Sequence, residues 1–121
     1  MTDFLTHKII GAAIEVHRNL GNGLLESIYA EALCFEFELR GIKCERQLGL
    51  DVIYKGKAIK GQRIDPLVEG MVVVELKSVL RLPEVATAQV LSYLKATGLK
   101  RGLLINFGVS KLVDGVKRIS L

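Results

Sequence analysis

The sequence predicts one mixed α/β domain in which helices cover both faces of a sheet. The hydrophobic period changes along the chain, from helical spacing before residue 41 to a period of two after residue 44. Two continuous apolar stretches, 71–79 and 101–108, then flank a helical segment, as expected of strands buried on both faces. With 121 residues, half of them hydrophobic, the chain has the size and composition of a single folded domain, residues 1–121.

Two helices are expected first. An apolar series at helical spacing predicts the first, with Thr2 or Asp3 as its N-cap and Gly21 as its stop; the series is Leu5, Ile9, Ala13, Val16 and Leu20. After a turn at "GNG", a second helix is expected from about residue 24 to residue 40, ending at Gly41. The residues expected along one side of this helix are Leu25, Ile28, Tyr29, Ala32, Phe35 or Glu36, and Leu39.

Three strands joined by tight turns follow, and they predict an antiparallel meander. The first strand, 44–54, is recognised by alternation of Cys44, Arg46, Leu48, Leu50, Val52 and Tyr54 with mostly polar neighbours. The second is expected over 58–68 and the third over 71–79. A helix over 83–97 can serve as a right-handed crossover, which would make strand 101–108 parallel to the third. The order is therefore α-α-β-β-β-α-β, with a short strand added at the C-terminus.

The remaining bulk properties narrow the function only slightly. No apolar run is long enough to span a membrane, and the start of the chain lacks the layout of a signal peptide. Cys34 and Cys44 are the only cysteines, and we expect two reduced, buried thiols in a cytoplasmic protein. The formal net charge of +4 suits a polyanionic partner, but many ordinary enzymes are equally basic, so the charge alone does not identify such a partner.

Opposite charges interrupt the third strand, and they predict a site. Glu75 and Lys77 are two residues apart on a strand, so their side chains point to one face. A three-residue turn at 69–71 would make residue 68 face residue 72 and bring Asp65 opposite Glu75, with Cβ atoms roughly 5 Å apart. Two carboxylates so close repel each other unless a cation lies between them. This hypothesis requires an odd-numbered turn or a bulge, which Gly70 or Pro66 can supply.

Carboxylate oxygens are the ligands that Mg²⁺ prefers, with Mn²⁺ as a substitute. A metal held there can activate water for attack on a phosphate, and Lys77 would contact the scissile phosphate or position the water. The alternative is an ion pair of Lys77 with Glu75 or Asp65 that has no catalytic role.

Three further features each allow two interpretations. Gln89 and Tyr93 share one side of the helix expected over 83–97, where they either hydrogen-bond near phosphates or form part of an exposed face. Glu26 lies in the first turn of the second helix, where it either favours the helix dipole or supplies a third acid. A basic cluster around the first hairpin either contacts phosphates or is solvated; its members are Lys55, Lys57, Lys60 and Arg63.

Taken together, Asp65, Glu75-Leu76-Lys77 and Gln89-x-x-x-Tyr93 resemble the PD-(D/E)xK nuclease superfamily, in particular its RecB-like branch with a trailing QxxxY motif. The element order from residue 24 onward is similar to the αβββαβ core of that superfamily. The stretch "GLLESIY", with Gly23, Glu26 and Tyr29, is similar to the signature of the small bacterial GxxExxY protein family, and the similarity extends over nearly the whole chain. One departure is that Ile64, not proline, precedes Asp65, and Pro66 follows it.

The resemblance implies a restriction-endonuclease-like fold with one extra N-terminal helix, and metal-dependent hydrolysis of phosphodiester bonds. It implies Asp65, Glu75 and the carbonyl of Leu76 as metal ligands and Lys77 as the catalytic lysine. It also implies Glu26 as the helix acid that reaches the metal, with Gln89 and Tyr93 in support.

The leading hypothesis is a Mg²⁺-dependent nuclease that acts on DNA in preference to RNA. Two alternatives stay open. One is a non-catalytic nucleic-acid-binding or adaptor module that retains the fold, and the other is a subunit that works only as a homodimer or with a partner protein. No membrane partner is expected.

Overall fold

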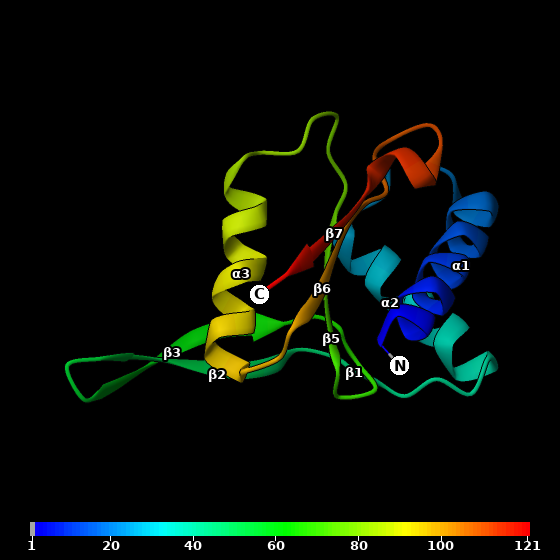
Figure 1. Ribbon diagram of the computed structural model, residues 1–121. Helices are drawn as coiled ribbons and strands as arrows, with labels where there is room; N and C mark the ends of the chain where they lie inside the picture. Colours follow the sequence, from blue (N-terminus) through cyan, green and yellow to red (C-terminus); the bar gives the residue numbers. More distant parts are fainter. Residues whose placement is uncertain (1) are drawn as a thin grey trace.

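Helices cover both faces of a central sheet in the computed structural model, which describes residues 2–121 and the side chains of residues 4–121. On one face lie α1 (Thr2–Leu20) and α2 (Glu26–Leu39), and on the other lies α3 (Val85–Thr97) (Figure 1). The predicted mixed α/β class is confirmed. The expected cap of α1 by Thr2 or Asp3 concerns side chains outside the described residues. Nowhere in residues 2–121 does a helix combine the length and the hydropathy that crossing a membrane requires.

The central sheet has the strand order β1-β4-β5-β6-β7. Its strands are β1 (Cys44–Glu45), β4 (Leu67–Val68), β5 (Val72–Lys77), β6 (Arg101–Asn106) and β7 (Val116–Ser120). The pair β5–β6 is parallel, as expected when α3 provides the crossover, and the other pairs are antiparallel. A short 3₁₀ helix, η1 (Leu112–Gly115), leads into β7.

Alternation along β5 and β6 builds two hydrophobic cores, one on each face of the sheet. Val72, Val74 and Leu76 pack with α1 and α2. Val73 and Leu104 pack with α3 instead. The continuous apolar sequence of both strands therefore reflects burial on two faces, as predicted, and it leaves Glu75 and Lys77 as the exceptions on the α3 side.

The antiparallel meander departs from the prediction, because each of its first two strands breaks in two. The segment 44–54 forms β1 and then β2 (Leu48–Tyr54), while 58–68 forms β3 (Lys57–Ile64) and then β4. The β2–β3 hairpin is a separate two-stranded sheet that projects from the body of the molecule (Figure 1). Positive φ at Gln47, 53°, turns one strand, and Pro66 has no N–H with which to continue the other. The outer residues Val52 and Tyr54 are therefore exposed.

The turn between β4 and β5 has the predicted length. Val68 pairs with Val72 and Leu67 with Val73, which leaves three residues, 69–71, in the turn. The N–H of Met71 donates to the carbonyl of Val68 at 3.0 Å. The register predicted from an odd-numbered turn is confirmed. It comes from the length of this turn and not from a bulge at Pro66.

The face of α2 that packs into the core differs from the predicted one. Tyr29, Ala30, Leu33 and Phe37 are buried, whereas most of the predicted side is exposed: Leu25, Ile28, Phe35 and Leu39. Apolar residues occur around most of this helix, so helical spacing fits more than one face. Packing against α1 and β5 selects the face that is buried. On α1 the predicted apolar side is confirmed, except that Leu20 at its end is 40% exposed.

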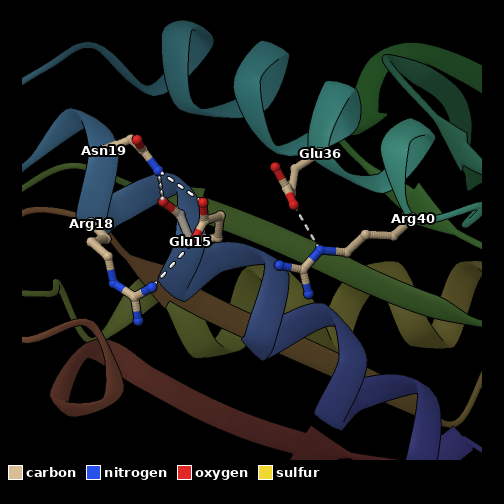
Figure 2. A network of polar contacts seen from close by, with 5 residues as sticks. All are labelled: Glu15, Arg18, Asn19, Glu36 and Arg40. Atoms are coloured by element: carbon tan, nitrogen blue, oxygen red, sulfur yellow. Dashed lines mark hydrogen bonds and ion pairs between the residues drawn. The ribbon is translucent and has the colours of Figure 1, made fainter.

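Polar contacts on α1 and α2 lie at the solvent side of their packing (Figure 2). Arg18 pairs with Glu15 at 3.2 Å on α1, and Arg40 pairs with Glu36 at 2.7 Å on α2. The Arg40 guanidinium also lies over Gly11 of α1, where an added Cβ would be 3.5 Å from one of its nitrogens. Pairs of this spacing contribute only a few tenths of a kcal/mol, so the apolar core holds the two helices together.

The prediction of two reduced thiols is wrong in this structure, because Cys34 of α2 and Cys44 of β1 form a disulfide. Their Cα atoms are 5.9 Å apart, since the chain reverses direction at Gly41 and brings β1 back alongside α2. Both residues are half-buried rather than buried.

Candidate active site

A cavity of about 370 Å³ lies where β5, the base of the β2–β3 hairpin and the start of α2 meet. It is lined by Glu26, Ser27, Ala30, Arg46, Gln47, Arg63, Asp65, Glu75, Leu76 and Tyr93. Five predicted site residues are therefore brought together from distant parts of the chain. The other two, Lys77 and Gln89, are not in the lining, but each contacts a residue that is.

A larger hollow, of about 1220 Å³, lies between α2, β1 and the 69–71 turn. Glutamates and the disulfide line much of it, and it contains none of the predicted site residues. Its size alone gives it no chemistry, so the smaller cavity is the candidate active site.

Strand geometry places Glu75 and Lys77 on one face, as predicted. Their side chains are 12% and 20% exposed, and the Lys77 Nζ lies 3.4 Å from a Glu75 carboxylate oxygen. Burial raises the pKa of Glu75, the charge of Lys77 opposes this, and the carboxylates of Glu26 and Asp65 add to the rise. The three acids thus act on one another electrostatically across the cavity.

The end of the β4–β5 pairing exposes the edge of β5 at Leu76. The N–H of Val74 donates to the carbonyl of Pro66 at 3.0 Å, but Ile64 pairs with Leu48 of the hairpin and not with β5. The main-chain N–H and C=O of Leu76 point to the same side of β5 as those of Val74, because the two residues are two apart on the strand. They therefore face the space that β4 would fill if its pairing with β5 continued. The side chain of Leu76 is in the core, and the residue therefore offers its main chain to the cavity.

Asp65 lies in the link between β3 and β4, not on a strand as predicted. It still lies level with Glu75, because the register of β4 against β5 continues up to Pro66. Its two carboxylate oxygens accept hydrogen bonds from the Arg46 guanidinium, both at 2.9 Å. These hydrogen bonds raise the pKa of Arg46.

Arg46 is a site residue that sequence reasoning missed. It was predicted only as a member of the alternating first strand, and its guanidinium also lies 3.6 Å from Glu31. The available signal was its place in that alternation, since Cys44, Arg46 and Leu48 share one predicted face and a charge there needs a partner. Arg63 was predicted as one of the hairpin cations, but the structure places it in the cavity wall.

Gln89 and Tyr93 lie on one side of α3, as predicted. The side-chain amide of Gln89 donates a hydrogen bond of 3.0 Å to the Tyr93 hydroxyl, which is thereby oriented at the cavity. Burial raises the pKa of Tyr93, and the negative charge of Glu75 raises it further. The hydrogen bond from Gln89 opposes this rise, and Tyr93 lies beside the acids as a hydrogen-bonding group.

The loop before α2 fixes Glu26 at the cavity. Gly23 has φ of 102°, a conformation that side chains rarely allow. The Tyr29 hydroxyl donates to the carbonyl of Gly21 at 2.6 Å and accepts from the N–H of Leu24 at 3.2 Å. The Ser78 hydroxyl, just beyond β5, donates to the Leu24 carbonyl at 2.5 Å. The loop is thus attached both to the helix that follows it and to the strand that bears Glu75.

A family model described as the PD-(D/E)XK nuclease superfamily matches residues 3–119. The chain belongs to this superfamily. Comparison with curated proteins and with solved structures gave no match. The mixed sheet flanked by three helices is consistent with the restriction-endonuclease-like fold of PD-(D/E)XK nucleases. Membership suggests that the chain is a nuclease that binds nucleic acid, and nucleases of this superfamily generally use divalent metal ions.

The cavity offers the donor types that a PD-(D/E)XK metal ion needs. Glu26, Asp65 and Glu75 supply carboxylates, and Leu76 supplies a main-chain carbonyl. Within residues 2–121, however, no group of three or more His, Cys, Asp or Glu side chains is close enough to hold an ion. Mg²⁺ keeps several waters and is often bound through one or two carboxylates, so the residues fit a hydrated ion better than a closed protein cage.

We expect Glu75→Gln to stabilise the fold in metal-free buffer, and increasingly so as the pH rises. Burial raises the pKa of Glu75 above its ordinary value of 4.5, so the folded state binds this proton more tightly than the unfolded state. The stability that the proton contributes is complete below pH 4.5 and is lost as the pH rises through the folded-state pKa. Urea unfolding of both proteins across this range measures the difference. Glu38→Gln, which removes an exposed carboxylate of α2, is the matched control.

We expect Arg46→Gln to tighten Mg²⁺ binding by about tenfold in the absence of nucleic acid. The guanidinium occupies both oxygens of Asp65, and removing two charge-assisted hydrogen bonds and a positive charge frees that carboxylate. Calorimetric titration with Mg²⁺ measures the change. Arg63→Gln removes another cavity cation without freeing Asp65 and should give a smaller gain. Unchanged affinity in Arg46→Gln would argue against Asp65 as a ligand.

Proposed function

We propose that the protein is a metal-dependent nuclease that hydrolyses phosphodiester bonds at the cavity of about 370 Å³. The observation that carries the proposal is the arrangement of Glu26, Asp65, Glu75 and the Leu76 main chain around one space, with Lys77 bonded to Glu75. In a chain of the PD-(D/E)XK superfamily, this arrangement is best explained by phosphodiester hydrolysis.

A divalent ion, Mg²⁺ or Mn²⁺, would supply two kinds of chemistry here: a more acidic bound water and neutralisation of charge on the phosphate. Asp65, Glu75 and the Leu76 carbonyl would hold it, with Glu26 contributing directly or through water. Lys77 would hold the attacking water or the phosphate oxygen at its Nζ, from the position that its contact with Glu75 defines. Arg46 and Arg63 would orient the phosphate, and the Tyr93 hydroxyl would donate a hydrogen bond beside it.

For the substrate we propose DNA in preference to RNA. The net charge of +4 supports binding that is led by phosphates, sensitive to salt and largely independent of sequence. The similarity of Gly23, Glu26 and Tyr29 to the bacterial GxxExxY signature supports assignment to that narrower family. A cytoplasmic location, a homodimeric state or a partner protein stays a prediction.

One observation favours a second candidate, a nucleic-acid-binding module without catalysis. Both oxygens of Asp65 are occupied by Arg46, and Glu75 is paired with Lys77, so these two proposed metal ligands each have a cationic partner. A module of this kind would bind nucleic acid with strong salt dependence but would leave it intact.

Cleavage assays separate the two candidates. The purified protein is incubated with single- and double-stranded DNA and RNA in Mg²⁺, Mn²⁺ or EDTA, beside Lys77→Ala. Cleavage that requires metal and is lost in Lys77→Ala supports the nuclease. Salt-sensitive binding without cleavage under any of these conditions supports the module. Cleavage that survives both EDTA and Lys77→Ala would contradict the mechanism proposed here.

A further inference from the structure

The β2–β3 hairpin with its turn, residues 48–64, forms an arm that projects from the body of the molecule (Figure 1), and Arg63 at its base lines the cavity. It carries four cations and one acid, a net charge of +3, against +4 for the whole chain. These five residues are Asp51, Lys55, Lys57, Lys60 and Arg63. Three quarters of the net charge of the protein is therefore placed on a segment that reaches the core only at its base, through Leu48, Leu50 and Ile64.

One face of the arm continues the wall of the cavity. Leu48 and Leu50 pack into the core under α3, and side chains alternate along a strand, so Gly49 and its partner Arg63 belong to the opposite face. Arg63 lines the cavity, and Lys60 lies farther out along the same strand. We call this the open face of the arm.

The open face is low at its base and bulkier farther out. Gly49 carries no side chain, whereas Ile53, on the same face and opposite Ala58, is 65% exposed. The pairing shifts by one residue between Leu50 and Val52, and Gly61, with φ of 128°, lies in β3 at this bulge. The backbone around Gly49 can therefore approach a polyanion closely, and the bulge bends the arm without adding bulk.

The charges of the arm are poorly neutralised by the rest of the protein. Lys60 lies 3.2 Å from Asp51, on the arm itself. For Lys55, Lys57 and Arg63 no ion pair is found among the residues that the structure describes. At the tip, the Lys55 ammonium lies 5.5 Å from the centre of the Tyr54 ring, and Tyr54 is 60% exposed. Lysines beside an exposed aromatic ring are typical of surfaces that bind nucleic acid.

We propose that the arm is a binding surface for the phosphate backbone of a nucleic acid, which it holds outside the segment that enters the cavity. The proposal rests on the nucleic-acid substrate proposed above, and it assigns the arm a positioning role. Seven residues of β2 extend over about 20 Å, so the arm reaches roughly half a turn of duplex from the cavity. The partner is the sugar–phosphate chain, because cations and glycines offer no pattern for reading bases.

The test compares two triple variants with the same loss of charge. One is Lys55→Gln/Lys57→Gln/Lys60→Gln on the arm. The matched control is Lys95→Gln/Lys100→Gln/Lys111→Gln, three exposed lysines elsewhere on the surface. Binding to labelled DNA duplexes of 30 and 8 base pairs is measured in EDTA over a range of salt concentrations, so that no cleavage is needed.

The arm variant is expected to lose about tenfold or more in affinity for the long duplex. The slope of its log affinity against log salt concentration should become smaller in magnitude by about 2–3. The short duplex, about 27 Å long, extends along only part of the arm when it occupies the cavity, so it should lose less affinity than the long duplex. The control variant should stay within about threefold of the wild type for both. For a protein that cleaves, the KM of the arm variant should rise on long DNA while kcat at saturation is kept.

Equal losses in the arm and control variants would overturn the proposal, because charge alone would then explain binding. Unchanged binding in both would also overturn it and leave the arm as a solvated hairpin or a surface for a protein. An arm-specific loss in a protein that never cleaves would support the arm and reject the nuclease, so the two proposals can fail separately.

Discussion

Replacing Lys77 with methionine should lower the rate of phosphodiester cleavage by about 10²–10⁴-fold while changing nucleic-acid affinity only a few-fold. Methionine keeps most of the aliphatic length of the lysine but has no cation to hold a water or a phosphate oxygen. The Nζ lies 3.4 Å from Glu75, at the edge of the proposed metal site, and a group there acts on the reacting phosphate more than on the rest of the substrate. Single-turnover cleavage at saturating Mg²⁺ measures the chemical step, and EDTA binding assays measure affinity.

Methionine at residue 77 also removes the partner of a carboxylate that is only 12% exposed. We expect Lys77→Met to destabilise the fold by about 1–3 kcal/mol at neutral pH, because an unpaired buried charge keeps its desolvation cost. Adding Glu75→Gln in the same chain should restore the stability but not the cleavage. A double variant that recovers both, or a Lys77→Met protein that cleaves normally, would favour an ion pair with a structural role only.

The strongest sequence signals describe the centre of the sheet. Buried strands were recognisable over 71–79 and 101–108 because a strand buried on one face alternates apolar and polar residues, whereas these two runs are almost continuously apolar. A three-residue turn at 69–71 was one of two ways to bring Asp65 level with Glu75, the other being a bulge at Pro66, because a one-residue slip would send a whole strand to the wrong face. The register that brings Asp65 level with Glu75 was therefore predicted before any contact was known, and the roles of these acids stay a prediction.

The breaks in the meander were not predictable in the same way. Alternation continues through Arg46 and Leu48 although the chain turns at Gln47. A period of two indicates on which face each side chain lies, but it does not indicate where the strand changes direction. Pro66 marked the second break, but a proline is equally compatible with a bulge or an edge strand. The projecting arm follows from these two breaks.

Long-range pairing was the other missing information. Arg46 and Asp65 are 19 residues apart, and their hydrogen bonds exist only because β1 pairs with β4. The side of α2 that helical spacing predicts is mostly exposed, apart from Tyr29 and Ala32, because local spacing cannot tell which of several apolar faces meets another element. In both cases the local pattern lacks the tertiary contact that decides the outcome.

Tyr29→Ala should be among the most destabilising single substitutions in the protein, at about 3–5 kcal/mol. The side chain is fully buried, and its ring stacks on Phe107 with centroids 4.3 Å apart. Tyr29→Phe keeps the ring and should cost about 1–3 kcal/mol, because the carbonyl of Gly21 and the N–H of Leu24 lose their partner. Urea unfolding measures both. Tyr54→Phe, at the exposed tip of the arm, is the control and should change stability by less than about 0.5 kcal/mol.

The same hydroxyl connects stability to the proposed chemistry, because it fixes the loop that delivers Glu26. Tyr29→Phe, assayed where it is fully folded, should therefore cleave more slowly than the wild type, and Glu26→Gln should do so as well. If Tyr29 acts through Glu26, the double variant should be little slower than Glu26→Gln alone, since a misplaced acid and a missing acid fail in the same way. Losses that multiply would mean that Tyr29 affects the site by another route. If the losses do not multiply, Gly23 and Tyr29 of the GxxExxY-like stretch are positioning residues for the carboxylate of Glu26 between them.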